Sequence, residues 1–159
     1  MQEKQKKWIL RIALYLIGIM VLALGITLNT KTNLGVSPII SMPYAVAQIF
    51  GYETGTAVFV AYLIFIVLQI VLLKGKFPPF QFLQVAASYL TSAFITIFDW
   101  IIPPPDQMGM RLLVLALAII LTGIGAAVTV DVNIVPNPAD GLARVLGCLL
   151  YTSPSPRDS

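Results

Sequence analysis

The sequence has no histidine, a single cysteine and few charges. Of its 159 residues, 11% are charged and 58% are hydrophobic, whereas a soluble domain has about 25% charged residues. Without histidine the chain lacks the commonest general base and metal ligand, and Cys148 alone cannot form an internal disulfide or a cysteine metal cluster. The net charge of +3 is too small to indicate a nucleic-acid-binding surface. What remains is a polytopic membrane protein.

Four uncharged, continuously apolar segments are long enough to form membrane helices. A helix needs about 20 such residues to cross the hydrocarbon core of a bilayer. None of the four segments alternates in polarity as a lipid-facing barrel strand would. We therefore predict an all-α fold, a polytopic transmembrane helical bundle with about four full spans. The segments are residues 12–30, 54–73, 77–98 and 112–130.

A fifth uncharged stretch, residues 32–52, contains prolines and polar residues, so it can either cross the membrane or form a re-entrant half-helix. Lysines and Arg11 precede the first span, which favours a cytoplasmic N-terminus in the cell membrane. If residues 32–52 cross, Lys74 and Lys76 lie outside the cell. If they re-enter, both lysines lie inside. The positive-inside rule therefore favours a re-entrant helix that begins at Pro38.

An internal repeat relates two segments that lie one hundred residues apart. Three full crossings separate the two starts, so the second copy would be inverted, as in many secondary transporters. We predict a transmembrane domain over residues 1–147, with one repeat at 11–110 and the start of another at 111–147. A complete second repeat would require two further spans, so the natural bundle is expected to be truncated here. The matched residues are Arg11, Ile19, Gly25, Asn33 and Pro38 with Arg111, Ile119, Gly125, Asn133 and Pro138.

The last twelve residues, 148–159, switch from an apolar pattern to a string rich in serine and proline. They read CLLYTSPSPRDS and resemble the translated read-through of a transposase-type sequencing adapter. Segments of this kind are set aside in fold reasoning, like tags. Residues 148–159 are therefore expected to be a non-native tail, in which Cys148 carries no functional role.

Two proline-started helices are the strongest candidates for a site. Ser37 precedes Pro38 and Asn137 precedes Pro138, so each proline would take the first helical position behind a capping residue. If these helices begin inside the membrane, their free amide groups face a protein cavity and could bind an anion or a carboxylate. Asp140 would partly offset the positive end of the second helix. A locally capped turn at the interface, without any ligand, is equally consistent with these residues.

A polar stripe marks the expected span at residues 77–98. Its members recur at steps of three and four residues, so they share one helical face that should turn toward the bundle. Such a face lines a solute path or joins helices by hydrogen bonds, and we favour the second interpretation. The stripe comprises Gln81, Gln84, Ser88, Thr91, Ser92 and Asp99. Separately, Gly18 and Gly25 in the first span and Gly123 with Ala127 in the last are expected to allow close helix packing.

No catalytic or cofactor motif is present. The sequence has no phosphate-binding glycine loop, no metal-spaced ligand set and no nucleophile with a partnering base. Its acidic residues are scattered along the chain. We therefore expect neither an enzyme nor a bound cofactor or metal.

Two runs of the sequence carry a family resemblance. RIALYLIGIMVLALGITLNTKTNLGVSP and VDVNIVPNPADGLARVLG resemble the YczE/YyaS/YitT-type integral membrane proteins of bacteria, through the NLGVSP turn and the P-x-x-D-G-L segment. The resemblance covers most of residues 11–147 and implies a membrane location and a helical architecture, but no defined activity. One departure is that Ile39 and Ile40 follow Pro38, where many relatives would carry an acid as at Asp140.

These features predict a small-solute transporter or permease built as an inverted repeat, whose partners are the lipid bilayer and a small solute. The alternative is a non-transporting membrane protein that stabilises or positions another protein, or a second copy of itself, through the glycine faces and the polar stripe. The predicted central site consists of Asn33, Ser37, Pro38, Asn137, Pro138 and Asp140, lined by Ser88 and Thr91.

Overall fold

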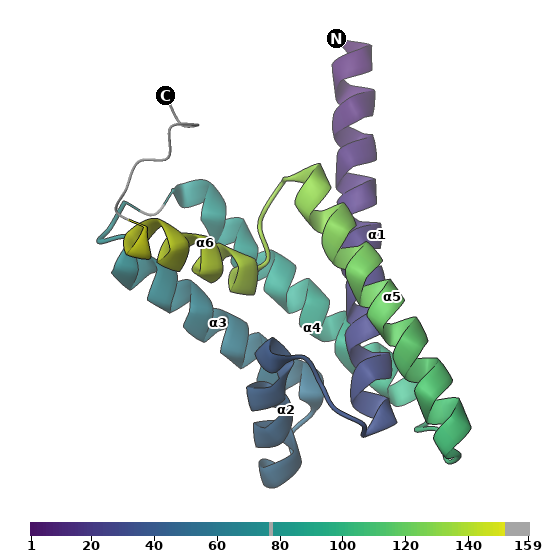
Figure 1. The fold of residues 1–159 in the computed structure, drawn as a ribbon. Helices are drawn as coiled ribbons and strands as arrows, with labels where there is room; N and C mark the ends of the chain where they lie inside the picture. Colours follow the sequence, from purple (N-terminus) through teal and green to yellow (C-terminus); the bar gives the residue numbers. More distant parts are fainter. Residues whose placement is uncertain (77, 152–159) are drawn as a thin grey trace.

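The computed structural model describes residues 1–76 and 78–151. Within these ranges the chain is all-helical and contains no strand, which confirms the predicted fold class. The elements, drawn in Figure 1, are α1 (Gln2–Thr32), α2 (Pro38–Phe50), α3 (Thr54–Leu72), a short 3₁₀ helix (Pro79–Phe82), α4 (Leu83–Ile101), α5 (Met108–Val132) and α6 (Pro138–Leu150).

Three of the helices, α1, α3 and α5, are long and apolar enough to span a membrane. The expected span at residues 77–98 is corrected by the structure. The helix there begins at Leu83 and ends at Ile101, and it is not among the apolar spans although it has 19 residues. The reason is the polar stripe, which makes α4 too polar to face lipid on all sides. Position 77 itself lies outside the described residues.

Four of the six residues of the predicted polar stripe turn toward the bundle from α4; Asp99 is partly exposed, and the side chain of Gln81 lies outside the described part of the chain. Gln84, Ser88, Thr91 and Ser92 are all buried, and Ser92 donates a hydrogen bond of 2.7 Å to the backbone carbonyl of Gly55 in α3. The stripe therefore contributes to helix association inside the bundle, where such bonds stabilise by about 0.6–2 kcal/mol each.

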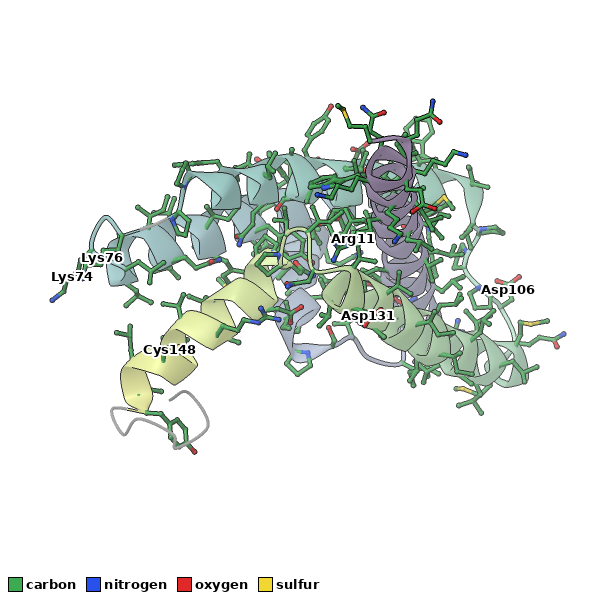
Figure 2. The ribbon with its side chains drawn as sticks, turned by 90° about the horizontal axis from the view of Figure 1, so that it is seen from above. Arg11, Lys74, Lys76, Asp106, Asp131 and Cys148 are labelled. Atoms are coloured by element: carbon green, nitrogen blue, oxygen red, sulfur yellow. The ribbon has the colours of Figure 1, made fainter. Side chains whose placement is uncertain are left out.

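Helix α2 does not cross the bundle. Figure 1 shows the chain leaving the lower end of α1, turning back, and entering α2, which runs down again toward the start of α3. With 13 residues, α2 is about 20 Å long, shorter than the roughly 30 Å of a hydrocarbon core. As a result the α3–α4 connection lies toward the N-terminal end of the bundle and the α4–α5 connection at the other end. Figure 2, seen from above, shows that Lys74 and Lys76 also lie on the opposite side of the bundle from Asp106.

Helices α1 and α5 pack antiparallel around a pairwise symmetric contact. A Cβ atom added at Gly25 would lie 2.6 Å from the backbone nitrogen of Thr122, and one added at Gly125 would lie 2.5 Å from that of Leu22. Gly25 and Gly125 are one hundred residues apart, and so are Leu22 and Thr122. Gly25 contacts Thr122 and Gly125 contacts Leu22, so equivalent positions of the two helices make the same contact in both directions. This reciprocity is typical of a two-fold contact. Only glycine permits backbones this close.

The glycine expectation is therefore partly wrong. Gly18 and Gly25 do pack against α5, since a Cβ atom at Gly18 would lie 3.0 Å from the Thr129 side chain. On α5, however, a Cβ atom added at Gly123 would meet nothing within 4 Å, and Ala127 is exposed. The close contact is made by Gly125 instead, because it lies on the helix face that α1 covers.

The two helix–turn–helix segments also repeat one hundred residues apart. Helix α1 ends at Asn33 with φ 53°, and α5 ends at Asn133 with φ 48°. Asparagine is among the few residues that adopt this left-handed conformation at a helix end. After each asparagine, an extended capping residue precedes a helix of 13 residues that begins with proline, namely α2 after Ser37 and α6 after Asn137.

Candidate functional site

The start of α6 lies against two buried glutamines from α3 and α4. The Nε2 atom of Gln69 donates to the backbone carbonyl of Pro138 at 3.0 Å and to Oε1 of Gln84 at 3.3 Å. Both glutamine side chains are 0% exposed, and Pro138 is fully buried as well. Three helices therefore meet at a pair of amides in the interior of the bundle.

This amide cluster, defined as Gln69, Gln84 and Asn137, has unused hydrogen-bonding capacity. Oε1 of Gln69, Nε2 of Gln84 and Oδ1 of Asn137 are buried without a hydrogen-bond partner in the described part of the chain. A buried polar group without a partner costs about 1–3 kcal/mol. If the cluster served packing alone, its unpartnered atoms would destabilise the fold. It is suited to receive the polar groups of a ligand.

Gly141 is what allows Gln69 to reach the first turn of α6. A Cβ atom at Gly141 would lie 2.7 Å from Oε1 of Gln69, so any larger residue would push the amide away. The Tyr62 ring is also buried here, beside Asn137. Ser88 donates to the backbone carbonyl of Gln84 at 2.6 Å, a bond within α4.

The starts of α2 and α6 each adjoin a small cavity against the α1–α5 pair. The cavity at α2 has about 20 Å³ and the cavity at α6 about 10 Å³, and a single water requires about 10–15 Å³. Three lining positions of one cavity correspond to three of the other at a spacing of one hundred residues. The corresponding positions are Asn29 with Thr129, Ser37 with Asn137, and Thr122 with Leu22.

The structure brings only part of the predicted site together. Asn137 and Pro138 belong to the region of the amide cluster, and Ser88 and Thr91 lie buried on the adjacent face of α4. Thr91 lines the same cavity as Asn137.

The first-repeat residues of the predicted site lie elsewhere. Asn33 is exposed at the end of α1, where its Oδ1 accepts a hydrogen bond of 3.0 Å from the Tyr44 hydroxyl. Pro38 is exposed, in contrast to its buried counterpart Pro138. Ser37 lines the separate cavity at α2. The difference arises because α3 and α4 cover the start of α6, whereas no corresponding pair of described helices covers the start of α2.

Asp140 faces an open groove between α5 and α6 and not the amide cluster. The groove is also lined by Arg144, Ala126 and Val130. Among the described residues no ion pair joins Asp140 to Arg144, and the capping residue Asn137 makes no side-chain bond to the helix. Asp140 therefore acts on the start of α6 through its charge at the first turn.

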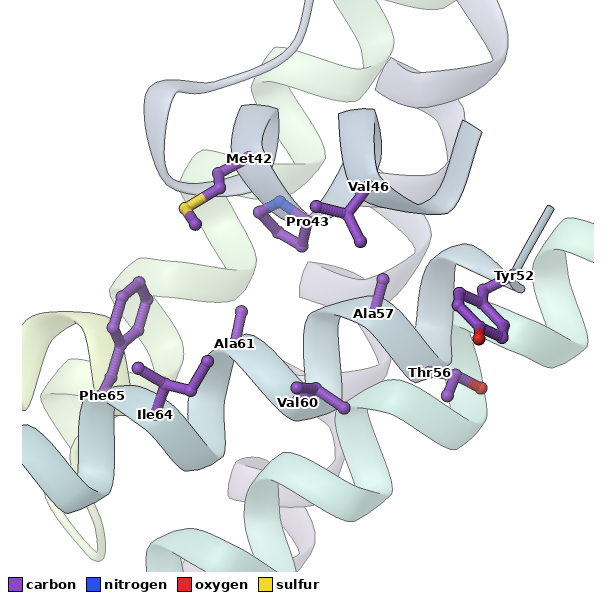
Figure 3. A pocket seen from close by; sticks show the side chains of 10 residues that line it. All are labelled: Met42, Pro43, Val46, Tyr52, Thr56, Ala57, Val60, Ala61, Ile64 and Phe65. Carbon is purple, nitrogen blue, oxygen red and sulfur yellow. The ribbon is translucent and has the colours of Figure 1, made fainter. Parts of the chain in front are cut away.

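A second groove, between α2 and α3, is apolar. Figure 3 shows Met42, Pro43 and Val46 of α2 facing Val60 and Ile64 of α3. Its volume is about 340 Å³, but its walls offer almost no group that could fix a polar solute. In a membrane such a groove suits lipid chains, so the amide cluster is the better candidate for a polar site.

Sequence reasoning missed the central residue, Gln69. It is the one amide in α3, a helix that is otherwise apolar enough to span a membrane. A polar side chain within a membrane span is costly and usually faces the bundle interior. That signal was available in the sequence, whereas the contact with the carbonyl of Pro138 depends on the folded chain.

Comparison with known proteins adds a family and little more. A protein-family model, described as a family of unknown function, matches residues 9–150. Comparisons with curated proteins and with solved structures give no match. The matched range covers α6 to its end, including the first three residues of the expected non-native tail, and residues 152–159 of that tail lie outside the described residues.

Proposed function

The chain belongs to this family, DUF6198, and we propose that it is a permease for a small polar solute, with its binding site at the amide cluster. The observation that carries the proposal is the burial of Gln69 and Gln84 with unpartnered polar atoms beside the start of α6. Amides that served only to join helices would use their hydrogen-bonding capacity on each other. These leave a donor and two acceptors open.

The architecture supports the same proposal. Secondary transporters commonly bind substrate where helices begin inside the bundle at the interface of inverted repeats. Helix α6 begins against α3 and α4 inside the bundle. The contact between α1 and α5 has two-fold character. The antiparallel α1–α5 pair is the arrangement that an inverted repeat requires.

We also propose the cytoplasmic membrane as the location, with the N-terminus in the cytoplasm. Lysines precede the apolar part of α1, and the α3–α4 connection, which carries Lys74 and Lys76, lies toward the same end of the bundle (Figure 1). Cytoplasmic loops carry an excess of such residues. Labelling with an impermeant amine reagent in sealed right-side-out vesicles, read at Lys74 and Lys76, tests the orientation, because these two lysines would react before the vesicles are opened only in an inverted protein.

Water access to the cluster tests the transport proposal. Starting from a Cys148→Ser background, a Gln84→Cys variant in native membranes is treated with a membrane-impermeant thiol reagent. A permease must expose its site to water during alternation between states, so we expect labelling. The matched control is Ile95→Cys, which lies on the same helix and is 0% exposed in the apolar core. If Gln84→Cys reacts no faster than Ile95→Cys, the cluster is a dry structural contact and the permease proposal fails.

A further inference from the structure

The open atoms of the amide cluster define the kind of ligand it can bind. Nε2 of Gln84 is a free donor, while Oε1 of Gln69 and Oδ1 of Asn137 are free acceptors. Rotating either glutamine amide exchanges its donor with its acceptor, and the cluster keeps both kinds of group. A matching ligand therefore presents N–H groups and a carbonyl oxygen together.

An anion fits this cluster poorly, although it lies at a helix N-terminus. Pro138 has no backbone N–H, so the first turn of α6 offers an anion only the backbone N–H groups of Ala139 and Asp140. Two free acceptors would face the anion, and the Asp140 carboxylate in the first turn opposes the positive end of the helix. The anion site that the sequence suggested is therefore opposed by a carboxylate and by two open acceptors.

A cation fits poorly as well. The side chains of the cluster carry no charge, and the Asp140 carboxylate, which lines the open groove beside Arg144, is already set against the positive end of α6. The free donor of Gln84 would also oppose a cation. Placing an uncompensated charge inside a membrane bundle costs several kcal/mol.

Resting on the permease proposal, we infer that the amide cluster selects a small, planar, neutral solute of the amide or urea class. The cavity at the start of α6, about 10 Å³, is lined by Asn137 and Pro138 but by neither glutamine, so in this conformation it holds no more than a water and a solute needs room made between the two amides. The solute takes the place of the Gln69–Gln84 hydrogen bond, which at 3.3 Å is the longer of the two bonds of Gln69. Each amide then bonds the solute in place of its neighbour.

Three planar probes of similar size and fixed charge test this selectivity. Urea is neutral, guanidinium is its cationic counterpart, and nitrate is an anionic one. Purified full-length protein is reconstituted into liposomes, and uptake of labelled urea is measured against protein-free liposomes, with guanidinium or nitrate added as competitors. We expect urea uptake above background and no inhibition by equal concentrations of either ion.

Two variants make the test specific to the cluster. Gln84→Leu removes the free donor and should lower urea uptake about fivefold or more, the factor for one lost hydrogen bond. Ser92→Ala, on the same helix but bonded to Gly55 outside the cluster, should retain uptake. Gln69→Glu should shift the preference from urea to guanidinium, a gain that a misfolded protein cannot show.

The outcomes separate the two proposals. If guanidinium or nitrate is carried and urea is not, the chain is a permease and the inferred solute class is wrong. If none of the probes crosses faster than in protein-free liposomes, the permease proposal fails and the inference fails with it. If Gln84→Leu carries urea at the unaltered rate, the amide cluster is not the selecting site.

Discussion

The close contact between α1 and α5 makes a quantitative prediction about Gly25 and Gly125. In Gly25→Ala the new methyl group would lie 2.6 Å from the backbone nitrogen of Thr122, whereas ordinary contacts begin at 3.4 Å. The two helix backbones must therefore separate by about 0.8 Å. Overpacking of this kind costs about 1–3 kcal/mol. Because the obstructing atoms include backbone, truncating Thr122 to alanine should not restore the loss.

Gly123→Ala is the matched control for this prediction. Gly123 lies on α5, two residues from Gly125, and a Cβ atom added there would meet nothing within 4 Å. Any change in intrinsic helix preference from glycine to alanine is shared by all three variants. The difference between Gly123→Ala and the other two therefore isolates the packing cost. By the two-fold contact, Gly25→Ala and Gly125→Ala should be destabilised by similar amounts.

Unfolding in mixed micelles measures these differences. The purified protein is titrated with sodium dodecyl sulfate while tryptophan fluorescence reports unfolding, and the free energies are compared among variants. We expect Gly25→Ala and Gly125→Ala to unfold at a lower detergent fraction than Gly123→Ala, by about 1–3 kcal/mol. Equal stability of all three would refute the close contact and, with it, the two-fold arrangement of α1 and α5.

Two further predictions concern single polar contacts. The buried Tyr15 hydroxyl donates to the carbonyl of Val135 at 3.0 Å, so Tyr15→Phe should lower the free energy of unfolding by about 1 kcal/mol. The same change at the exposed Tyr89 should leave the free energy of unfolding unaltered. An unaltered free energy of unfolding in Tyr15→Phe would contradict the contact. Lys31 and Asp99 form an ion pair of 3.0 Å that is partly exposed. Asp99→Asn should therefore lower the free energy of unfolding by less than about 1 kcal/mol, and the difference should disappear in high salt. A larger loss that does not depend on salt would contradict this assignment.

The helical class and the two proline-started helices follow from local sequence. Continuous apolar runs cannot be strands in lipid, and proline behind a capping residue fixes where a helix begins. For the same reason the helix ends at Asn33 and Asn133 recur at the spacing seen in the sequence. These features depend on neighbours along the chain, so they can be predicted without a fold.

The expected glycine contact on α5 could not be placed in the same way. Gly123 and Gly125 are both small residues within one apolar helix, and composition does not distinguish which of them faces α1. That choice depends on how the two helices are rotated about their own axes. In the structure, Gly125 faces Leu22 and Gly123 faces open space.

The sequence by itself determined that this is a helical membrane protein whose helix signals repeat at a spacing of one hundred residues. The length of apolar segments and the residues that start and end helices are local properties of the chain. Only the tertiary structure decided where polar groups gather. Gln69 from α3, Gln84 from α4 and the carbonyl of Pro138 are distant in sequence and meet because three helices converge at the start of α6. That convergence also covers Pro138 and leaves Pro38 exposed, so two segments with the same local signals acquire different surroundings and chemistry.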